Sequence, residues 1–285
     1  MYSPDFAYHR ATSLASAHAL LAENPGAKVI AGGHSLIPLL KLRLASPAAL
    51  IDIGRIAELR GISQAGDTIR IGALTTHHEL ASSAVLKESA AALAEAAGQV
   101  GDPAVRNRGT IGGNIAHADP ASDLPTVLVA LGAQIVAARA QGERTIPAEQ
   151  FFTGIMTTSL EEDEIVAAVM VPASGTGQAS AYAKFSHPAS RYAVVGAAAL
   201  LTRQGGKCTA ARVAIGGLVA FARRAPSVER GLVGTAADEA AIQSAAALIS
   251  KDLGKDVTGD IFASAEYRAA VAPAYVKRAL TAAAR

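Results

Sequence analysis

The chain has 285 residues, of which 51% are hydrophobic, and its 26 basic and 24 acidic side chains leave a formal net charge of +2. This length predicts two or three domains with sizeable cores. The basic residues are scattered, whereas phosphate backbones need a basic stripe, so we expect no nucleic-acid partner. The longest apolar run, near residues 193–201, is far shorter than the roughly 20 residues that span a bilayer, so we expect no transmembrane segment.

The N-terminus and the cysteine content favour a cytoplasmic protein. Asp5, His9 and Arg10 stand among few apolar residues near the N-terminus, where a signal peptide would have an apolar core. Cys208 is the single cysteine, which excludes an intrachain disulfide and a four-thiolate iron–sulfur cluster within this chain. We expect Cys208 to be a buried structural thiol at the start of a strand.

The first predicted unit is a small α/β subdomain at residues 1–56. Helical spacing and a Thr12 or Ser13 cap predict a helix over 13–23, which ends at Asn24-Pro25-Gly26. Short strands are predicted at 27–31 and 50–53, separated by a brief helix over 36–44.

The second predicted unit covers residues 57–174, and the third covers 178–285 after a Gly- and Pro-containing linker at 172–177. In the second unit we expect a strand at 68–73, a helix at 84–99, a buried segment at 124–131, a hairpin at 134–138 and 142–146, and a strand at 165–171 after a solvated acidic turn. In the third unit we expect strands at 180–185, 194–203 and 208–216, then helices at 236–252 and 264–280. Strands followed by helices predict an α+β fold with helices on one face of an antiparallel sheet.

Two glycine-paired segments are the most distinctive feature. One follows the apolar pair Val29-Ile30 and reads Ala31-Gly32-Gly33-His34-Ser35-Leu36, and the other reads Thr110-Ile111-Gly112-Gly113-Asn114. The second lies in a Gly-, Asn-, Asp- and Pro-rich stretch, 101–125, that we predict to be a fixed loop. Glycines with positive φ can turn successive amides to one side to form an anion nest. Two such loops could grip one diphosphate, although each could also be a simple tight turn.

Other familiar sites are not indicated. Neither glycine segment has the G-x-G-x-x-G or the P-loop spacing. His77-His78, His117, Asp119 and Asp123 invite a metal interpretation, but no HExxH or CxxC frame is present, so we expect no metal. The hydrolase elbow G-x-S-x-G is missing too, and we assign no catalytic residue.

Segments 29–36, 71–76 and 102–123 together resemble the FAD-binding medium subunit of the molybdenum hydroxylases, the xanthine dehydrogenase and aerobic carbon monoxide dehydrogenase family. The similarity covers essentially the whole chain and is most specific over residues 106–125. It implies a two-subdomain FAD-binding fold of the PCMH/vanillyl-alcohol-oxidase type, followed by a C-terminal antiparallel sheet with helices on one face.

The resemblance also implies the cofactor-binding residues. The two glycine segments would meet the FAD pyrophosphate, and Asp123 would bind a polar group such as a ribose hydroxyl; for Asp123 a helix cap is the alternative. Lys184 would lie close to the flavin, although by itself it would be read as a surface lysine. The full set is Val29, Ile30, Ala31, Gly32, Gly33, His34, Ser35, Leu36, Val100, Thr110, Ile111, Gly112, Gly113, Asn114, Asp123, Val166, Lys184 and Tyr192.

One departure from the family pattern concerns Tyr192. The carbon monoxide dehydrogenase type has a tryptophan in the segment that corresponds to residues 190–193, whereas this chain contains no Trp. Tyr192 is the candidate to replace it against the flavin. Arg106 and Arg108 could pair with the diphosphate or with carboxylates such as Asp102, and the sequence does not choose between these.

The function that the resemblance implies is an electron-transfer subunit of a heterotrimeric molybdenum hydroxylase. Its FAD would collect electrons from two [2Fe–2S] clusters in a small partner chain, while a large partner chain would hold the molybdenum cofactor. A dimer of heterotrimers in the cytoplasm, with the inner face of the membrane as an alternative location, is the implied assembly. The alternatives are a self-sufficient FAD-dependent oxidase or dehydrogenase of the same fold, and an assembly protein whose glycine segments are only turns.

Overall fold

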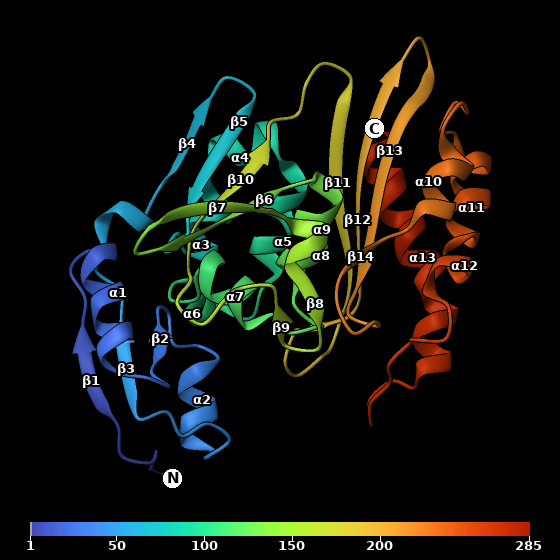
Figure 1. Cartoon of the computed structure of the whole chain (residues 1–285). Helices are drawn as coiled ribbons and strands as arrows, with labels where there is room; N and C mark the ends of the chain where they lie inside the picture. The colour runs from blue at the N-terminus through green and yellow to red at the C-terminus, as the bar shows by residue number, and fades with distance from the viewer. Residues whose placement is uncertain (1) are drawn as a thin grey trace.

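The computed structural model describes residues 2–285 and places three main sheets next to one another (Figure 1). The predicted mixture of helices and sheets is confirmed. The strands of each main sheet come from one of the three predicted units, although the domain limits themselves remain a prediction. No helix within residues 2–285 is both long enough and apolar enough to cross a membrane.

The first sheet is parallel, with strand order β1-β3-β2. The Ser13 hydroxyl caps helix α1 by accepting from the Ser16 amide, as the sequence suggests. Strand β1 was not predicted because three of its four residues are exposed, so it lacks the apolar alternation of a half-buried strand. The elements of this unit are β1 (Ala7–Arg10), α1 (Leu14–Glu23), β2 (Lys28–Ile30), α2 (Leu36–Lys41) and β3 (Ala49–Asp52); the 3₁₀ helix η1 (Ala57–Leu59) follows at the start of the second unit.

The second sheet is antiparallel, with strand order β4-β5-β10-β6-β7. The predicted hairpin is confirmed, since Arg139 pairs with Gly142 at its turn. The strands are β4 (Ile62–Ala65), β5 (Thr68–Gly72), β6 (Gln134–Arg139), β7 (Gly142–Pro147) and β10 (Ile165–Pro172), and α9 (Ala148–Phe151) leads into a small pair, β8 (Phe152–Gly154) and β9 (Thr157–Thr158).

Two predictions for the helices of this unit are wrong. The single helix expected at 84–99 is two helices, because Ala90 leaves the helical region with φ −156°. The loop expected at 101–125 contains two short helices and the start of a third, each preceded by a polar residue. The helices of the unit are α3 (His77–Ser82), α4 (Ala84–Ser89), α5 (Ala91–Gln99), α6 (Pro103–Arg106), α7 (Ile111–His117) and α8 (Asp123–Leu131).

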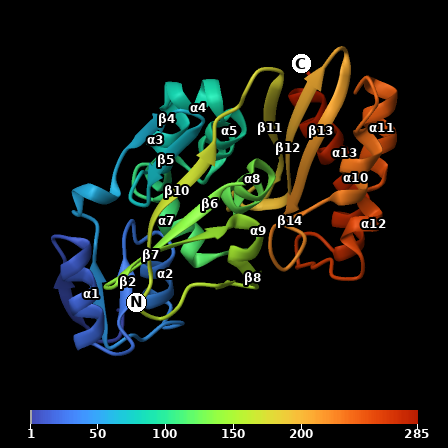
Figure 2. The ribbon, with the colours of Figure 1, turned by 45° about the horizontal axis from the view of Figure 1, so that its top comes forward.

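The third sheet is antiparallel and runs β11-β12-β13-β14. The C-terminal helices cover one face, as predicted, while α5 and α8 of the second unit lie against the other (Figures 1 and 2). The helix expected at 236–252 is interrupted near Leu248, and α10 was missed. The elements are β11 (Gln178–Ser186), β12 (Ala193–Gln204), β13 (Lys207–Gly216), β14 (Arg223–Arg224), α10 (Pro226–Leu232), α11 (Glu239–Ala247), α12 (Ile249–Leu253) and α13 (Ala265–Ala283).

Buried clusters join the three units. The central core around α5 and α8 extends into the third sheet through Ala198 and Ala214. A second shared cluster contains Ile51 of the first unit together with Leu74 and Ala167 of the second unit. Both contacts bury apolar surface, which favours a fixed arrangement of the units. Cys208 is buried in the apolar core between the third sheet and the C-terminal helices, as predicted.

Candidate functional site

The two glycine segments lie against each other, which confirms their predicted proximity. A Cβ added to Gly32 would stand 2.1 Å from the carbonyl oxygen of Arg108, just before the second segment. A Cβ added to Gly113 would stand 3.9 Å from the Cβ of Ala31. The first segment follows β2 and the second begins α7, so residues almost 80 positions apart form one surface.

The first segment has the properties of an anion-binding loop. Gly33 adopts φ +75°, a conformation that favours glycine. Within residues 2–285, the backbone amides of residues 32–35 donate no hydrogen bond. The ring of His34 turns back on its own loop, where Nδ1 donates to the Gly32 carbonyl over 3.1 Å. Unpaired amides on a half-buried loop favour binding of an anion.

The second segment is not the nest that its glycines predict. Gly112 and Gly113 lie in the first turn of α7 and neither has a positive φ. The Gly112 amide donates to the Ala73 carbonyl over 2.8 Å, and the Gly113 amide donates to the Thr110 hydroxyl over 3.2 Å. The amides on either side, those of Ile111 and Asn114, are paired as well.

Instead, these two glycines allow neighbouring chain segments to approach α7 closely. A Cβ on Gly112 would stand 2.6 Å from the Cβ of Ala73, so glycine lets α7 touch the end of β5. Gly113 is exposed and faces the Thr110 hydroxyl and Ala31, where its missing side chain leaves room beside the first segment. The first segment therefore supplies free donors, and the second supplies space. Both features suit a bound diphosphate.

His77 lies against Gly109, just before the second segment, and was not predicted as a site residue. Its backbone amide donates to the Gly109 carbonyl over 3.0 Å, and its ring is 3% exposed. The Nδ1 atom is buried and has no partner among the described residues. Burial, together with the smaller effects of the charges of His34 and Arg106, lowers the pKa of His77 to about 4. His77 is therefore neutral at physiological pH.

Asp123, Tyr182 and Lys184 form a buried polar cluster. Tyr182 Oη donates to Asp123 Oδ1 over 2.6 Å, and Lys184 Nζ donates to Asp123 Oδ2 over 2.8 Å. Lys184 Nζ also donates to the Gln99 carbonyl over 3.0 Å, and the side chain is fully buried, so its interpretation as a surface lysine is wrong. Burial raises the pKa of Asp123, and Lys184 and Tyr182 oppose that rise.

The structure removes the helix-cap alternative for Asp123. The N-cap of α8 is Ser122, and Asp123 is the first helical residue with its side-chain oxygens directed to β11. Binding of a ribose hydroxyl by Asp123 remains a prediction. Tyr182 was missed, although its two-residue separation from Lys184 places both side chains on the same face of a strand.

The other predicted positions differ in exposure. Val166 is buried in the central core, Val100 is half-buried after α5, and Tyr192 is 42% exposed in the turn between β11 and β12. Burial raises the pKa of Tyr192, and the charges of Asp119 and Asp123 contribute to the rise.

The two arginines have different roles. Arg106 Nη1 donates to the carbonyls of Val100 and Gly101 over 3.1 and 3.0 Å and therefore holds the chain between α5 and α6. Arg108 is exposed, and its guanidinium forms neither an ion pair nor a hydrogen bond in the described part of the chain. Arg108, unlike Arg106, is free to meet an anion.

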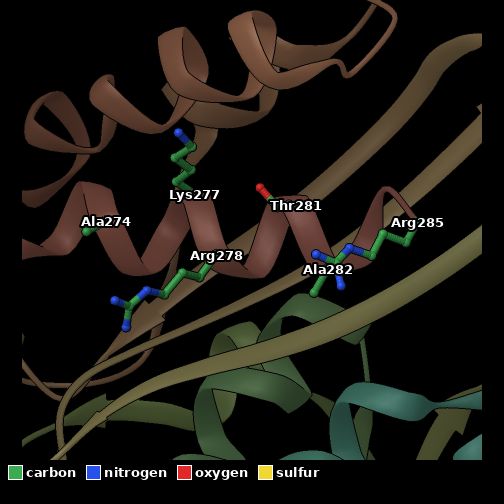
Figure 3. A pocket seen from close by; sticks show the side chains of 6 residues that line it. All are labelled: Ala274, Lys277, Arg278, Thr281, Ala282 and Arg285. Carbon is green, nitrogen blue, oxygen red and sulfur yellow. The ribbon is translucent and has the colours of Figure 1, made fainter.

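Two surface hollows lie away from these residues. One of about 420 Å³ lies on α13 and is lined by Ala274, Lys277, Arg278, Thr281, Ala282 and Arg285 (Figure 3). The other, of about 260 Å³, includes Gly132 and Arg212 in its wall. None of the predicted site residues lines either hollow. Among residues 2–285 no group of three or more His, Cys, Asp or Glu side chains could hold a metal ion.

Comparison with known proteins identifies the family of both halves. Residues 4–174 match the model for the FAD-binding domain in molybdopterin dehydrogenase, and residues 180–283 match the carbon monoxide dehydrogenase flavoprotein C-terminal domain. The carbon monoxide dehydrogenase medium chain of Hydrogenophaga pseudoflava is 42% identical over 99% of this chain and 98% of its own length. A solved carbon monoxide dehydrogenase from that organism, lacking the Mo-pyranopterin moiety, has a chain that matches with a TM-score of 0.94 over 99% of this chain and 98% of its own length.

A relative associated with a different substrate is nearly as similar. The alpha subunit of the 6-hydroxypseudooxynicotine dehydrogenase complex of Paenarthrobacter nicotinovorans is 39% identical over 98% of this chain and 95% of its own length. The whole chain, including both glycine segments and the C-terminal sheet, is thus covered by relatives that are oxidoreductase subunits. The chain belongs to the family of FAD-binding flavoprotein subunits of the molybdopterin dehydrogenases.

Proposed function

We propose that this chain binds FAD between its two glycine segments and acts as the electron-transfer subunit of a heterotrimeric molybdenum hydroxylase. The unpaired amides of residues 32–35, in the segment that lies against Gly113, are the observation that carries this proposal. They provide donors for a diphosphate, and the family match supplies its identity. Bound FAD would supply the ability to accept electrons singly and to release them in pairs.

The residues divide into three groups around the proposed cofactor. Residues 29–36 would hold the pyrophosphate through backbone amides, and residues 110–114 would pack against it without a side chain at position 113. Asp123 and Lys184 would present fixed charges from the buried cluster, and Tyr192 would cover the flavin from the β11–β12 turn. Val100 and Val166 would supply apolar surface.

The proposed partners come from the family match: a small subunit with two [2Fe–2S] clusters and a large subunit with the molybdenum cofactor. The single cysteine of this chain cannot ligate a four-thiolate cluster, so such clusters would have to lie in another chain. The two relatives named above have nearly equal identity, yet one is named for carbon monoxide and the other for 6-hydroxypseudooxynicotine. The substrate is therefore chosen outside this chain. We expect a dimer of heterotrimers, located in the cytoplasm or at the inner face of the membrane.

The alternative, a self-sufficient FAD-dependent oxidase or dehydrogenase, is less well supported. Such an enzyme needs an acid or base over the flavin, for which His187 and Tyr192 are the candidates. His187 Nδ1 accepts from the amides of Ala189 and Ser190, each over 3.2 Å, so this nitrogen is not available as a base. That leaves Tyr192, whose raised pKa makes it a poor base at neutral pH.

Two exposed helical glycines provide a matched test. We expect Gly113→Val to fill the space beside Ala31 and to abolish FAD retention. Gly98→Val, in α5, meets only the Cβ of Ala81 at 3.7 Å and should retain FAD. Flavin absorbance and iron and molybdenum content would be measured on each variant, purified with co-expressed neighbouring subunits. Full flavin occupancy in Gly113→Val would contradict the proposed site, and a yellow, active chain without iron or molybdenum would favour the oxidase.

A further inference from the structure

His77 is a buried polar side chain without a polar partner. The residue is 3% exposed, and its Nδ1 is buried without a hydrogen-bond partner within residues 2–285. Buried polar groups are nearly always hydrogen-bonded, and an unpaired one destabilises the fold. An imidazole at this position therefore calls for an explanation beyond packing.

The burial of Nδ1 favours one tautomer. Nδ1 is sealed from solvent with no acceptor near it, so a proton there would be an unpaired donor in the core. Nε2 lies on the side of Gly109, where a Cβ on that glycine would come within 2.9 Å of it. We infer that the neutral ring carries its proton on Nε2, beside Gly109 and just before the second glycine segment.

The surroundings of that proton are basic. The groups whose charges act on His77 are His34, from the first segment, and Arg106, from α6, and no carboxylate is among them. The unpaired amides of residues 32–35 add partial positive charge. A cation at position 77 would be repelled, whereas a neutral donor there adds to a site for an anion.

We propose that His77 is a binding residue whose Nε2–H donates a hydrogen bond to a phosphate oxygen of the cofactor held between the glycine segments. This inference rests on the proposed function, because the anion is the diphosphate of FAD. It adds a side-chain donor from α3 to the backbone donors of the first segment. The Nε2–H donor, which has no partner among the described residues, is then paired when the cofactor is bound, while Nδ1 stays buried and unprotonated.

Three substitutions separate the donor from the packing of the ring. Gln places its amide nitrogen where histidine has Nε2, Asn places its amide near Nδ1, and Leu has no donor. The flavin-free complex would be titrated with FAD, and the ³¹P resonances of bound FAD would be recorded for each variant. We expect His77→Gln to bind within about 3-fold of wild type, and His77→Leu and His77→Asn to bind roughly 10- to 100-fold more weakly.

Stability provides the second readout. Without FAD, His77→Leu should melt at or above the wild-type temperature, since it removes an unpaired polar atom from the core. Wild-type affinity for FAD in His77→Leu, or equal affinity in His77→Asn and His77→Gln, would overturn the inference while leaving the proposed function intact. Unchanged ³¹P shifts in a weakened His77→Leu variant would also overturn it. A wild-type complex that binds no FAD would overturn both proposals.

Discussion

Replacing Lys184 by Met should cost much more stability than its location on a strand suggests. The Lys184 ammonium is fully buried and bonds to Asp123 at 2.8 Å and to the Gln99 carbonyl at 3.0 Å. Removing one partner of a buried ion pair leaves the other charge uncompensated and typically costs about 3–5 kcal/mol. At about 2 °C per kcal/mol for a chain of this length, the melting temperature should fall by roughly 6–10 °C.

A surface ion pair provides the control for this prediction. Lys277 lies 3.3 Å from Glu239, but their side chains are 34% and 87% exposed. Exposed pairs contribute about 0–1 kcal/mol, so Lys277→Met should shift the melting temperature by less than about 2 °C. Both variants would be compared with wild type by differential scanning calorimetry at pH 7. Equal shifts in the two variants would refute the argument that burial makes the Lys184 pair important.

The pH dependence tests whether charge causes the loss. Burial raises the pKa of Asp123 above its ordinary value of 3.8, and Lys184→Met removes the cation that opposes this rise. When the pKa of a group is higher in the folded state than in the unfolded state, its contribution to stability is fully present below the unfolded-state pKa. That contribution is lost as the pH increases through the folded-state pKa. The deficit of Lys184→Met should therefore be small near pH 4 and grow toward pH 7. Adding Asp123→Asn to Lys184→Met should recover most of the loss at pH 7.

Two further predictions concern the second unit. Arg144 and Arg139 hold the pKa of Glu164 at about 2, below its ordinary 4.5. The Glu164 carboxylate should therefore contribute about 2–3 kcal/mol to the free energy of unfolding, after allowance for the partly exposed arginines. This contribution should be present above pH 4.5 and lost toward pH 2. Glu164→Gln should lower the melting temperature at pH 7 but much less at pH 3, and an equal gap at both pH values would contradict this. Arg106→Met removes two hydrogen bonds to carbonyls, so the free energy of unfolding measured in urea should fall by about 1–3 kcal/mol. Arg108→Met should lower it by less than about 0.5 kcal/mol. Equal losses would contradict the structural role assigned to Arg106.

Elements with strong local signals were predictable from the sequence. The hairpin β6–β7 and the three long strands of the third sheet alternate or run apolar over many residues. Helix α1 has a Ser cap and a clear end at Asn24. Strand β1 could not be found in this way, because it is an exposed edge whose place is fixed by pairing with β3.

The stretch 101–125 was misread because residues that favour loops also begin helices. Asp102 caps α6 by accepting from the Val105 amide, with Pro103 at the first helical position, and Thr110 caps α7. The glycine pair suggested positive φ, whereas Gly112 is required by its contact with Ala73. That contact joins segments almost 40 residues apart, which no local pattern reveals.

The polar contacts of the site could not be predicted from local sequence patterns either, because they join residues that are far apart in the chain. Asp123 and Tyr182 are separated by 59 residues, and their contact depends on the third sheet packing on α8. His77 was considered only together with His78 as a metal ligand, and no metal was expected; the structure shows that His78 is exposed while His77 is buried. Only the folded chain shows that His77 lies against Gly109, next to the second glycine segment.

The candidate site depends on how the units pack as much as on its own residues. The first glycine segment belongs to the first unit and the second to the next, so the space between them is set by the buried cluster that contains Ile51, Leu74 and Ala167. The Asp123 cluster fixes the third sheet to the same region through Lys184 and Tyr182. A cofactor held between the segments would therefore contact parts of all three units. Cofactor binding should accordingly stabilise their contacts together, since a ligand that binds only the assembled arrangement favours it.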